Sequence, residues 1–361
     1  MKAAIISLGS LSSAWTAKAM RAYFDEVDEI DLKDIEISFT GKKQEILYKG
    51  EPLDNYDGIY AKGSFRYANL LSALTSMLSP VSYLPIYSSA FTVAHDKLLT
   101  QLRLHAANIP MPKTFLTSNI SAAKNILKKM NYPIIMKFPS GTQGKGVMFA
   151  DSKASALSIL DALAVLKQPV IIQEYVETNS TDIRAVVVGE KVIAAYKRVA
   201  AIGEKRANIH QGGVGEMIIL DAKTKKIAIA AAKAIKAEIC GVDILEGAKG
   251  PVVLEVNISP GLQGVTKCTK IDVADEIAKY IFEKTKVLKA SDTETKAKDL
   301  FTDLGIEDSV KGDGVSELIT TLDLRSNRLL LPEIITKKTE FGEHGEVVLK
   351  FMKGKLEIVK F

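Results

Sequence analysis

The alternation of short apolar runs with segments of helical spacing is the feature that most restricts how this chain can fold. Three strand-like runs and two helix-like segments occur in residues 1–93, namely AAIISL (3–8), EILYKG (45–50), DGIYAK (57–62), 15–24 and 67–78. Strands that are separated by helices pair in parallel, because the returning chain needs a crossover connection. We therefore expect residues 1–93 to form an N-terminal open α/β domain around a parallel sheet.

Residues 94–287 show a mixed order of elements that predicts α+β structure. A helix is expected to begin near Ala94 and to end before the prolines of IPMP (109–112), because proline removes a backbone donor and disfavours helical geometry before itself. Residues from about 112 to 175 then indicate a lobe of strands and helices around a glycine-rich loop. Further strands are expected at 183–199, 241–246 and 252–257, and helices at 222–239 and 271–285.

The last part of the chain differs in composition from the rest. Residues 288–314 are rich in Lys, Asp, Thr and Ser and predict a linker that holds a short helix. Residues 315–361 contain short strand-like runs with the turn signals GEHG and KG, and they predict a small C-terminal β module.

Composition and cysteine usage indicate a cytoplasmic protein. The 361 residues contain no apolar run near the roughly 20 residues that a membrane span needs, and MKAAIISLGS is too short and polar for a signal peptide. Cys240 and Cys268 are too few for a disulfide framework or a cysteine-based metal cluster, so we expect them to be small structural residues.

The net charge of +5 is concentrated in the central segment. Residues 1–95 hold 9 basic and 11 acidic residues, residues 96–287 hold 27 and 18, and residues 288–361 hold 12 and 14. The basic surplus lacks the dense Lys/Arg run and interleaved aromatics of a nucleic-acid surface, so nucleic acid is not the expected partner. Anionic small molecules such as nucleotide phosphates explain the basic surplus equally well, and charge alone does not decide between the two.

Three oxygen-bearing side chains on two predicted strands form the strongest constellation. Glu255 and Asn257 are two residues apart in VVLEVN, so they point to the same face, and Asp243 lies in the strand GVDILE. Hard oxygen ligands, with positions left for water and phosphate, are what Mg²⁺ takes. Spacing alone leaves a second interpretation open, in which these are solvent-facing strand residues or a salt-bridged pair.

A glycine-rich loop and two lysines provide candidate phosphate contacts. The loop GTQGKG (141–146) can expose backbone N–H groups to a phosphate, but it lacks the spacing of a Walker A loop and can also be a simple hairpin. Lys137 lies in the apolar run YPIIMKF, and Lys97 follows Asp96 at a helix start. A lysine in an apolar strand usually has an anionic partner, although it can also extend its ammonium group to solvent.

Two polar segments complete the set of candidates. QEYV (173–176) runs from an apolar strand into a loop, where its backbone groups and Glu174 can meet an adenine edge. The loop EKRANIHQGG (204–213) gathers donors beside two glycines, which suits an anionic substrate and also suits a solvated surface loop.

In this order the segments resemble the ATP-grasp superfamily and, within it, the RimK-type alpha-L-glutamate (amino-acid) ligases. The resemblance is strongest over about 100 residues, from QEYV through TDIRAVVVGEKVIAA and EKRANIHQGG to GVDILE and LEVNISPGLQGV, and it extends more loosely over 1–287. It implies an open α/β domain followed by two α+β lobes that clasp ATP, with 94–287 as the ATP-grasp domain and about 112–175 as its lid lobe.

The resemblance also implies an activity. The γ-phosphate of ATP would pass to an acceptor carboxylate, and the amine of an amino acid would displace phosphate from the acyl phosphate to form an amide. L-Glutamate is the expected amino acid, and a peptide, a protein or a cofactor would carry the acceptor carboxylate. A homo-oligomer, either a dimer or a tetramer, is expected.

The same resemblance assigns roles to individual residues. Asp243, Glu255 and Asn257 would hold two Mg²⁺ ions, with Mn²⁺ as an alternative. Arg184, Arg206 and Asn208 would be the catalytic groups. The ATP contacts would be Lys97, Lys137, Gly141, Gly144, Gly146, Gln173, Glu174, Tyr175, Val176, Asp182 (on the ribose side), Arg206 and Asn208.

The chain departs from the family pattern at several places. Ala207 and Gln211 stand where Ser and Arg are usual, and Lys62 stands where an arginine is common. The change at Gln211 leaves the acceptor open, because arginine is the usual carboxylate clamp. The module after about residue 290 has no counterpart in the plain ligases and resembles AbrB-type swapped hairpins, which points to oligomerisation or substrate docking. A kinase-like phosphoryl transfer on the same fold and a nucleic-acid-binding role of this module are the alternatives.

Overall fold

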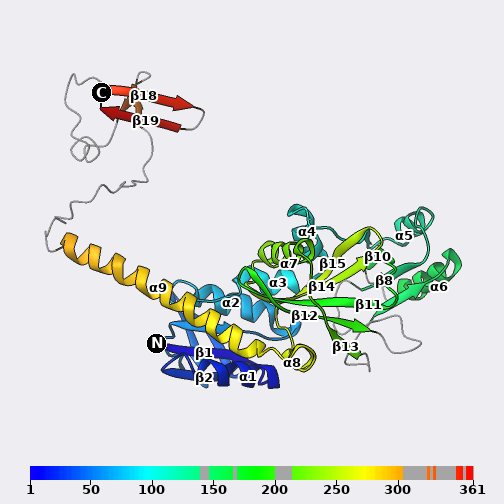
Figure 1. Cartoon of the computed structure of the whole chain (residues 1–361), viewed down its shortest axis with the longest axis horizontal. Helices are drawn as coiled ribbons and strands as arrows, with labels where there is room; N and C mark the ends of the chain where they lie inside the picture. The colour runs from blue at the N-terminus through cyan, green and yellow to red at the C-terminus, as the bar shows by residue number, and fades with distance from the viewer. Residues whose placement is uncertain are drawn as a thin grey trace. The chain divides into compact units, whose positions relative to one another are not determined.

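A computed structural model of the chain describes residues 1–138, 146–165, 169–199, 214–303, 323–325, 328–330, 347–352 and 355–360. Two compact units divide the chain, Met1–Asp299 and Leu300–Phe361 (Figure 1). The candidate site residues all belong to the first unit.

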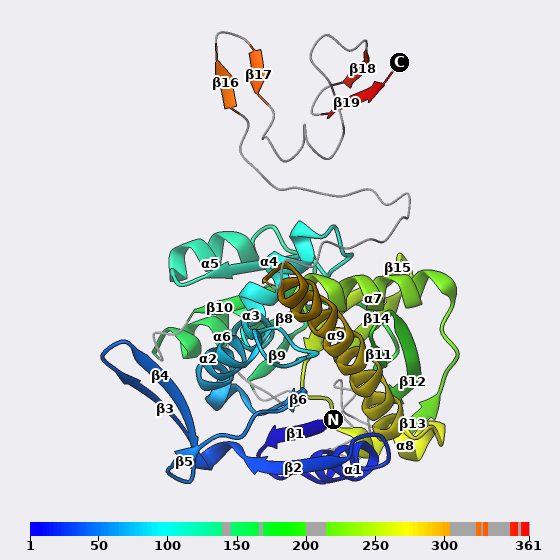
Figure 2. The same ribbon diagram turned by 90° about the vertical axis from the view of Figure 1, so that its left-hand side faces the viewer.

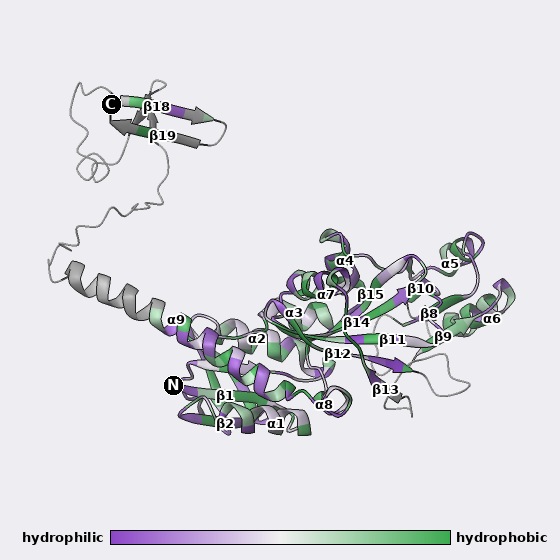
Figure 3. Ribbon diagram, in the orientation of Figure 1, coloured by the Kyte–Doolittle hydropathy of each residue, from purple (hydrophilic) through white to green (hydrophobic). Residues whose placement is uncertain are grey.

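A three-stranded parallel sheet forms the start of the first unit. Its order is β2 (Glu26–Asp31), β1 (Lys2–Ser7) and β6 (Gly58–Ala61), which confirms the predicted open parallel sheet. β1 is apolar along most of its length and almost fully buried (Figure 3). Edge strand β2 (EVDEID) is acidic and escapes a search for apolar runs. Its side chains Glu26 and Asp28 lie 2.9 and 3.1 Å from Lys2 Nζ.

The helices of this domain follow local capping signals. α1 (Leu11–Met20) begins four residues before the predicted start, because the Ser10 hydroxyl accepts a hydrogen bond from the Ser13 N–H and caps the helix. α2 (Ala68–Leu78) lies where the apolar spacing predicts it, with Leu71 and Leu74 buried.

The prediction that residues 45–50 join the parallel sheet is wrong. They fall in β4 (Lys43–Tyr48), which pairs antiparallel with β3 (Ile35–Thr40) and β5 (Glu51–Pro52) in a separate sheet. Figure 2 shows this hairpin standing apart from β1 and β2. A two-residue turn at Gly41, whose φ is +61°, closes the hairpin, and glycine adopts this conformation without steric cost.

The helix predicted to begin near Ala94 begins three residues later, at Lys97, and a separate short helix precedes it. α3 (Ser88–Ala94) ends at His95, and α4 (Lys97–Ala106) starts afresh. Asp96 causes the break, since its Oδ1 accepts from the N–H groups of Leu98 at 2.8 Å and Leu99 at 2.9 Å. This cap places Lys97 at the first position of α4.

The range predicted as the lid lobe holds a four-stranded antiparallel sheet. Its order is β7 (Thr114–Thr117), β10 (Val170–Glu174), β8 (Ile134–Lys137) and β9 (Val147–Ala150). Helices α5 (Ile120–Leu127) and α6 (Lys153–Val165) contribute to a separate apolar cluster with these strands.

A five-stranded antiparallel sheet forms the second lobe. Its order is β13 (Val214–Met217), β12 (Lys191–Val199), β11 (Thr181–Val188), β14 (Ile239–Gly247) and β15 (Gly250–Asn257). Helix α7 (Ala222–Ile235) packs against this sheet, and α8 (Leu262–Thr269) follows β15. The free, buried Cys240 agrees with a structural role.

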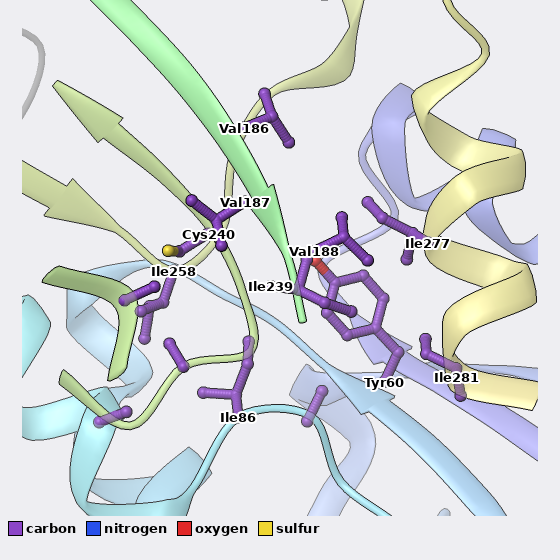
Figure 4. Close-up of a cluster of buried hydrophobic side chains, with 14 of the residues drawn as sticks. Tyr60, Ile86, Val186, Val187, Val188, Ile239, Cys240, Ile258, Ile277 and Ile281 are labelled. Atoms are coloured by element: carbon purple, nitrogen blue, oxygen red, sulfur yellow. The ribbon is translucent and has the colours of Figure 1, made fainter. Parts of the chain in front are cut away.

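One continuous core joins the second lobe to the N-terminal sheet. Figure 4 shows Tyr60 of β6 between Val188 and Ile239 of the five-stranded sheet and Ile277 and Ile281 of the last long helix. That helix, α9 (Val273–Asp303), extends well past the predicted end at 285 and covers the first part of the range predicted as a linker.

The second unit contains two antiparallel hairpins. β16 (Asp323–Arg325) pairs with β17 (Arg328–Leu330), and β18 (Val347–Met352) pairs with β19 (Lys355–Lys360). Across the described ranges, no helix has the length and apolar character needed to cross a membrane.

We predict that Gly58→Ala destabilises the contact between β6 and α9. A Cβ atom at Gly58 would lie 2.4 Å from Thr285 Oγ1, and that buried hydroxyl donates to the Ile281 carbonyl at 2.7 Å. The free energy of unfolding should fall by about 1–3 kcal/mol, measured by chemical denaturation. Thr285→Ala removes the opposing atom, so the double variant should recover most of the loss. Simple additivity of the two losses would contradict the steric contact.

Candidate active site

The three predicted metal ligands meet on neighbouring strands of the five-stranded sheet. Asp243 of β14 lies directly opposite Glu255 of β15, and Gly241 lies opposite Asn257. A β-bulge at Leu254 interrupts the ladder, because Ile244 pairs with Val253 and Asp243 pairs with Glu255. Glu255 is exposed whereas Val253 and Val256 are buried, so Glu255 points away from the core, and its cross-strand partner Asp243 is itself buried.

A buried charge network surrounds Asp243. Arg184 of β11 grips its carboxylate as a fork, with Nε 2.6 Å from Oδ1 and Nη2 2.6 Å from Oδ2. Arg198 of β12 reaches the same Oδ2 at 2.8 Å and also forks Asp182, at 2.5 and 2.7 Å. Two acids and two bases from three adjacent strands therefore neutralise one another inside the protein.

The network shifts the pKa values of its two carboxylates in opposite directions. Burial raises the pKa of Asp243, but Arg184 and Arg198 together outweigh burial and hold that pKa below its usual range. Burial also raises the pKa of Asp182, the nearby charge of Asp243 raises it further, and Arg198 offsets only part of the rise. Asp243 is thus an ionised carboxylate fixed in orientation.

The donor set of Asp243, Glu255 and Asn257 fits magnesium. An ionised carboxylate offers about four acceptor positions, so Asp243 can keep its arginine bonds and still donate electron density to a cation. The Asn257 Oδ1 accepts from the Ser259 N–H at 3.0 Å, which fixes the direction of its amide oxygen. The described residues hold no group of three or more His, Cys, Asp and Glu that could bind a metal, so the set depends on this amide.

Two predicted phosphate-binding lysines lie within electrostatic reach of Glu255. Burial lowers the pKa of Lys137 to about 8, while Glu255 raises it and Lys97 lowers it further. Burial also lowers the pKa of Lys97, against the opposing charges of Glu255 and Asp96. The charges of Lys137 of the lid lobe, Lys97 of α4 and Glu255 of β15 therefore influence one another, and the contacts of the two lysines with phosphate stay a prediction.

Lys137 belongs to a buried polar chain inside the lid sheet. Its Nζ donates to the Gln173 Oε1 at 2.9 Å, and the Gln173 Nε2 donates to the Thr114 Oγ1 at 2.7 Å. Gln173 was predicted as an ATP contact, and in this structure it holds the lysine. These two hydrogen bonds fix the Lys137 ammonium group without neutralising its charge.

The other lid residues predicted at the adenine lie where β10 leaves its sheet. The Glu174 Oε1 accepts from the Lys113 N–H at 2.8 Å, and the Tyr175 ring meets Phe149 edge-on at 5.3 Å. Val176 packs so closely on Gly247 that a Cβ there would lie 2.7 Å from Val176 Cγ1. These contacts fix the segment that connects the two lobes, and its adenine contact stays a prediction.

Several predicted residues lie outside the described ranges. They are Gly141, Gly144, Arg206 and Asn208. Gly146 is described, with a φ of +75° and with Phe138 only 2.7 Å from where its Cβ would be, so this position requires glycine. Asp182, predicted on the ribose side, is held by Arg198, and its ribose contact stays a prediction.

Sequence reasoning missed Arg198, although a signal for it existed. Two antiparallel strands joined by a turn at Gly189 place Arg198 opposite Asp182 and Tyr196 opposite Arg184. Counting opposite residues outward from that turn predicts the partner of Asp182 to within one residue of Arg198. The bulge after Val186 shifts the register, and periodicity alone does not reveal it.

Comparisons with known proteins agree with this architecture. A family model described as a RimK-like ATP-grasp domain matches residues 94–281. A protein from Vibrio atlanticus (strain LGP32) named "Probable alpha-L-glutamate ligase" is 36% identical over 291 residues, which cover 79% of this chain and 97% of that protein. Another protein of that name, from Marinomonas sp. (strain MWYL1), is 38% identical over 279 residues, covering 76% and 91%.

Solved structures share the fold at low sequence identity. The ATP-grasp ligase PsnB, complexed with minimal precursor, Mg and ADP, has a TM-score of 0.63 at 19% identity, covering 79% of this chain and 98% of its own. D-Alanine–D-alanine ligase from Bacillus anthracis has a TM-score of 0.57 at 17% identity, covering 81% and 99%.

The chain belongs to the RimK-like ATP-grasp family. It is an ATP-dependent ligase. The resemblance inferred from the sequence is thereby confirmed at the level of fold and family.

We predict that Arg198→Met destabilises the protein strongly. The substitution leaves the buried Asp182 and Asp243 carboxylates with one arginine fewer, which should lower the free energy of unfolding by about 3 kcal/mol. Arg21→Met is the matched control, because Arg21 pairs with Glu29 on the surface, and it should cost at most about 0.5 kcal/mol. Equal unfolding midpoints for the two variants would contradict the role given to the network.

Proposed function

We propose that this ligase adds L-glutamate, or a closely related amino acid, to a carboxylate on a peptide, a protein or a cofactor. The observation that carries the proposal is the similarity to two proteins named probable alpha-L-glutamate ligases over more than nine-tenths of their own length. The buried, forked carboxylate of Asp243 beside Glu255 supports it, because a metal-nucleotide site needs ionised oxygen ligands of fixed direction.

In the proposed reaction, a carboxylate oxygen of the acceptor attacks the γ-phosphorus of ATP and ADP leaves. The amine of the amino acid then attacks the carbonyl carbon of the acyl phosphate. The C–O bond to phosphate breaks, the nitrogen loses a proton, and an amide and inorganic phosphate result. Splitting the ligation in this way replaces a poor leaving group by a good one.

The chain's own residues supply binding and charge. Lys97 and Lys137 bind the phosphates, and the Gln173 bond holds the Lys137 ammonium in place. Arg184 orients Asp243 through two hydrogen bonds, and its positive charge also stabilises the negative charge that develops at the acyl phosphate. Arg206 and Asn208 act there too, and the glycines 141, 144 and 146 close over the phosphates.

The metal part of the proposal assigns Asp243, Glu255 and Asn257 to two Mg²⁺ ions, with Mn²⁺ as a substitute. Bound metal neutralises phosphate charge during the transfer. Glu174, Tyr175 and Val176 meet the adenine, and Asp182 lies on the ribose side. The C-terminal hairpins act in oligomerisation, as a dimer or tetramer, or in docking the acceptor.

We predict that Glu255→Gln abolishes turnover and spares the fold. Glu255 is exposed, so its neutral isostere should leave the unfolding midpoint unchanged while the rate of amide formation falls by about 100-fold or more. Glu246→Gln is the matched control on the neighbouring strand and should keep normal activity. Full activity of Glu255→Gln at saturating Mg²⁺ would contradict the metal assignment.

We also predict a glutamyl product in a direct assay. Protein incubated with ATP, Mg²⁺, L-glutamate and a fractionated cell extract should release ADP and phosphate, and mass spectrometry should find an acceptor heavier by one glutamyl residue. Omitting either L-glutamate or the extract is the control. A product that carries phosphate and no amide would overturn the ligase chemistry and favour a kinase-like transfer.

A further inference from the structure

Lys62 is a buried lysine at the carboxyl end of the N-terminal parallel sheet. It follows β6 directly, its N–H donates to the Ile6 carbonyl at 2.9 Å, and only 5% of its surface is exposed. The carboxyl ends of parallel strands are where open α/β sheets bind ligands. The position of Lys62 is therefore one from which a side chain can meet a substrate.

No acidic group accompanies this lysine in the part of the chain that the structure describes. Its recorded side-chain contact there is the ring of Tyr60, whose centroid lies 5.6 Å from Nζ, at the outer limit of a cation–π interaction. Burial lowers the pKa of Lys62 to about 8, and no neighbouring carboxylate opposes that effect. Burying an ammonium group without an anion is unfavourable, so a lysine in this state is suited to an anionic ligand.

A short hydrogen-bond relay connects Gly63, the residue after Lys62, to Asn257 of the candidate metal site. The Gly63 N–H donates to the Ser259 Oγ at 3.2 Å, and the Ser259 N–H donates to the Asn257 Oδ1 at 3.0 Å. The turn after β15 is tied to α1 as well, because the Leu262 N–H donates to the Ser12 Oγ at 2.9 Å. Gly63, which directly follows Lys62, thus contacts the turn that comes after Asn257.

We propose that Lys62 binds a carboxylate group of the organic substrate beside the turn that follows β15. This inference rests on the proposed ligase function and assigns part of its substrate site to the N-terminal domain. The carboxylate belongs either to the amino acid that is added or to the acceptor, since both reactants carry this group. A cation at this point attracts and orients the reactant, whereas Lys97 and Lys137 serve the nucleotide.

A purely structural lysine would behave differently when its charge is removed. Lys62→Met keeps the length of the buried stem and deletes an ammonium group that has no acidic partner among the residues that the structure describes. The unliganded melting temperature should therefore stay the same or rise. A lysine needed for folding would instead show a lower melting temperature in this variant, with the loss shared by every ligand tested.

The test measures thermal shifts of the full chain with Mg²⁺ and ADP present and either L-glutamate or N-acetyl-L-glutamate added. Wild type should show a rise with at least one of the two, and Lys62→Met should weaken that apparent affinity by about ten-fold or more. Lys62→Arg should retain most of the affinity, and Lys18→Met on the exposed face of α1 is the surface control. If Lys62→Met weakens a shift that only L-glutamate produces, Lys62 binds the added amino acid, because N-acetylation blocks the amine. If Lys62→Met weakens a shift that both compounds produce, Lys62 binds the acceptor.

Three results would overturn the inference. They are an unchanged affinity in Lys62→Met, the absence of a carboxylate-dependent shift in wild type, and a lowered unliganded melting temperature that Lys62→Arg restores without restoring binding. The proposed function fails separately. Carboxylate binding that depends on Lys62 without any amide product would refute the ligation of glutamate, and amide formation that is unaffected in Lys62→Met would refute only the role of Lys62.

Discussion

The buried ion network that crosses β12, β11 and β14 is the constraint on which the site depends. Removing four charged side chains from water is unfavourable unless each is paired, and here two carboxylates and two guanidinium groups satisfy one another. The pairing keeps Asp243 ionised and fixes its direction. It also aligns three strands in register, so the position of Glu255 on the next strand follows from the same arrangement.

The buried cations described here are therefore of two kinds, arginines paired with carboxylates and lysines held by neutral groups. Arg184 and Arg198 are both paired with carboxylates inside the sheet and maintain its geometry. Lys137 is held by the neutral amide of Gln173, and Lys62 lies over an aromatic ring, so both keep electrostatic capacity for an anion. The proposed reaction, which brings together a triphosphate and a carboxylate, would need cations of the second kind, positioned by groups that do not cancel their charge.

Much of the fold and part of the site could be predicted, and the failures have physical causes. The spacing of Glu255 and Asn257, together with the strand around Asp243, was enough to predict that these three side chains lie on neighbouring strands, because side-chain alternation is local. Strand β2 was missed since its acidic residues are stabilised by Lys2 from a neighbouring strand. Arg198 was missed because a bulge sets its pairing, and the helix that carries Lys97 starts three residues after Ala94 because the Asp96 side chain caps its first turn.

The relay from Asn257 through Ser259 to Gly63 has a consequence for the order of events in a catalytic cycle. Its two hydrogen bonds make the turn after β15 and the end of β6 one mechanical unit across two domains. If a ligand at one end changes the free energy of binding at the other, thermodynamic reciprocity makes the two effects equal. With the roles proposed for Asn257 and Lys62, nucleotide binding and substrate binding would be coupled through this turn, and their order of addition would depend on the backbone as well as on the side chains.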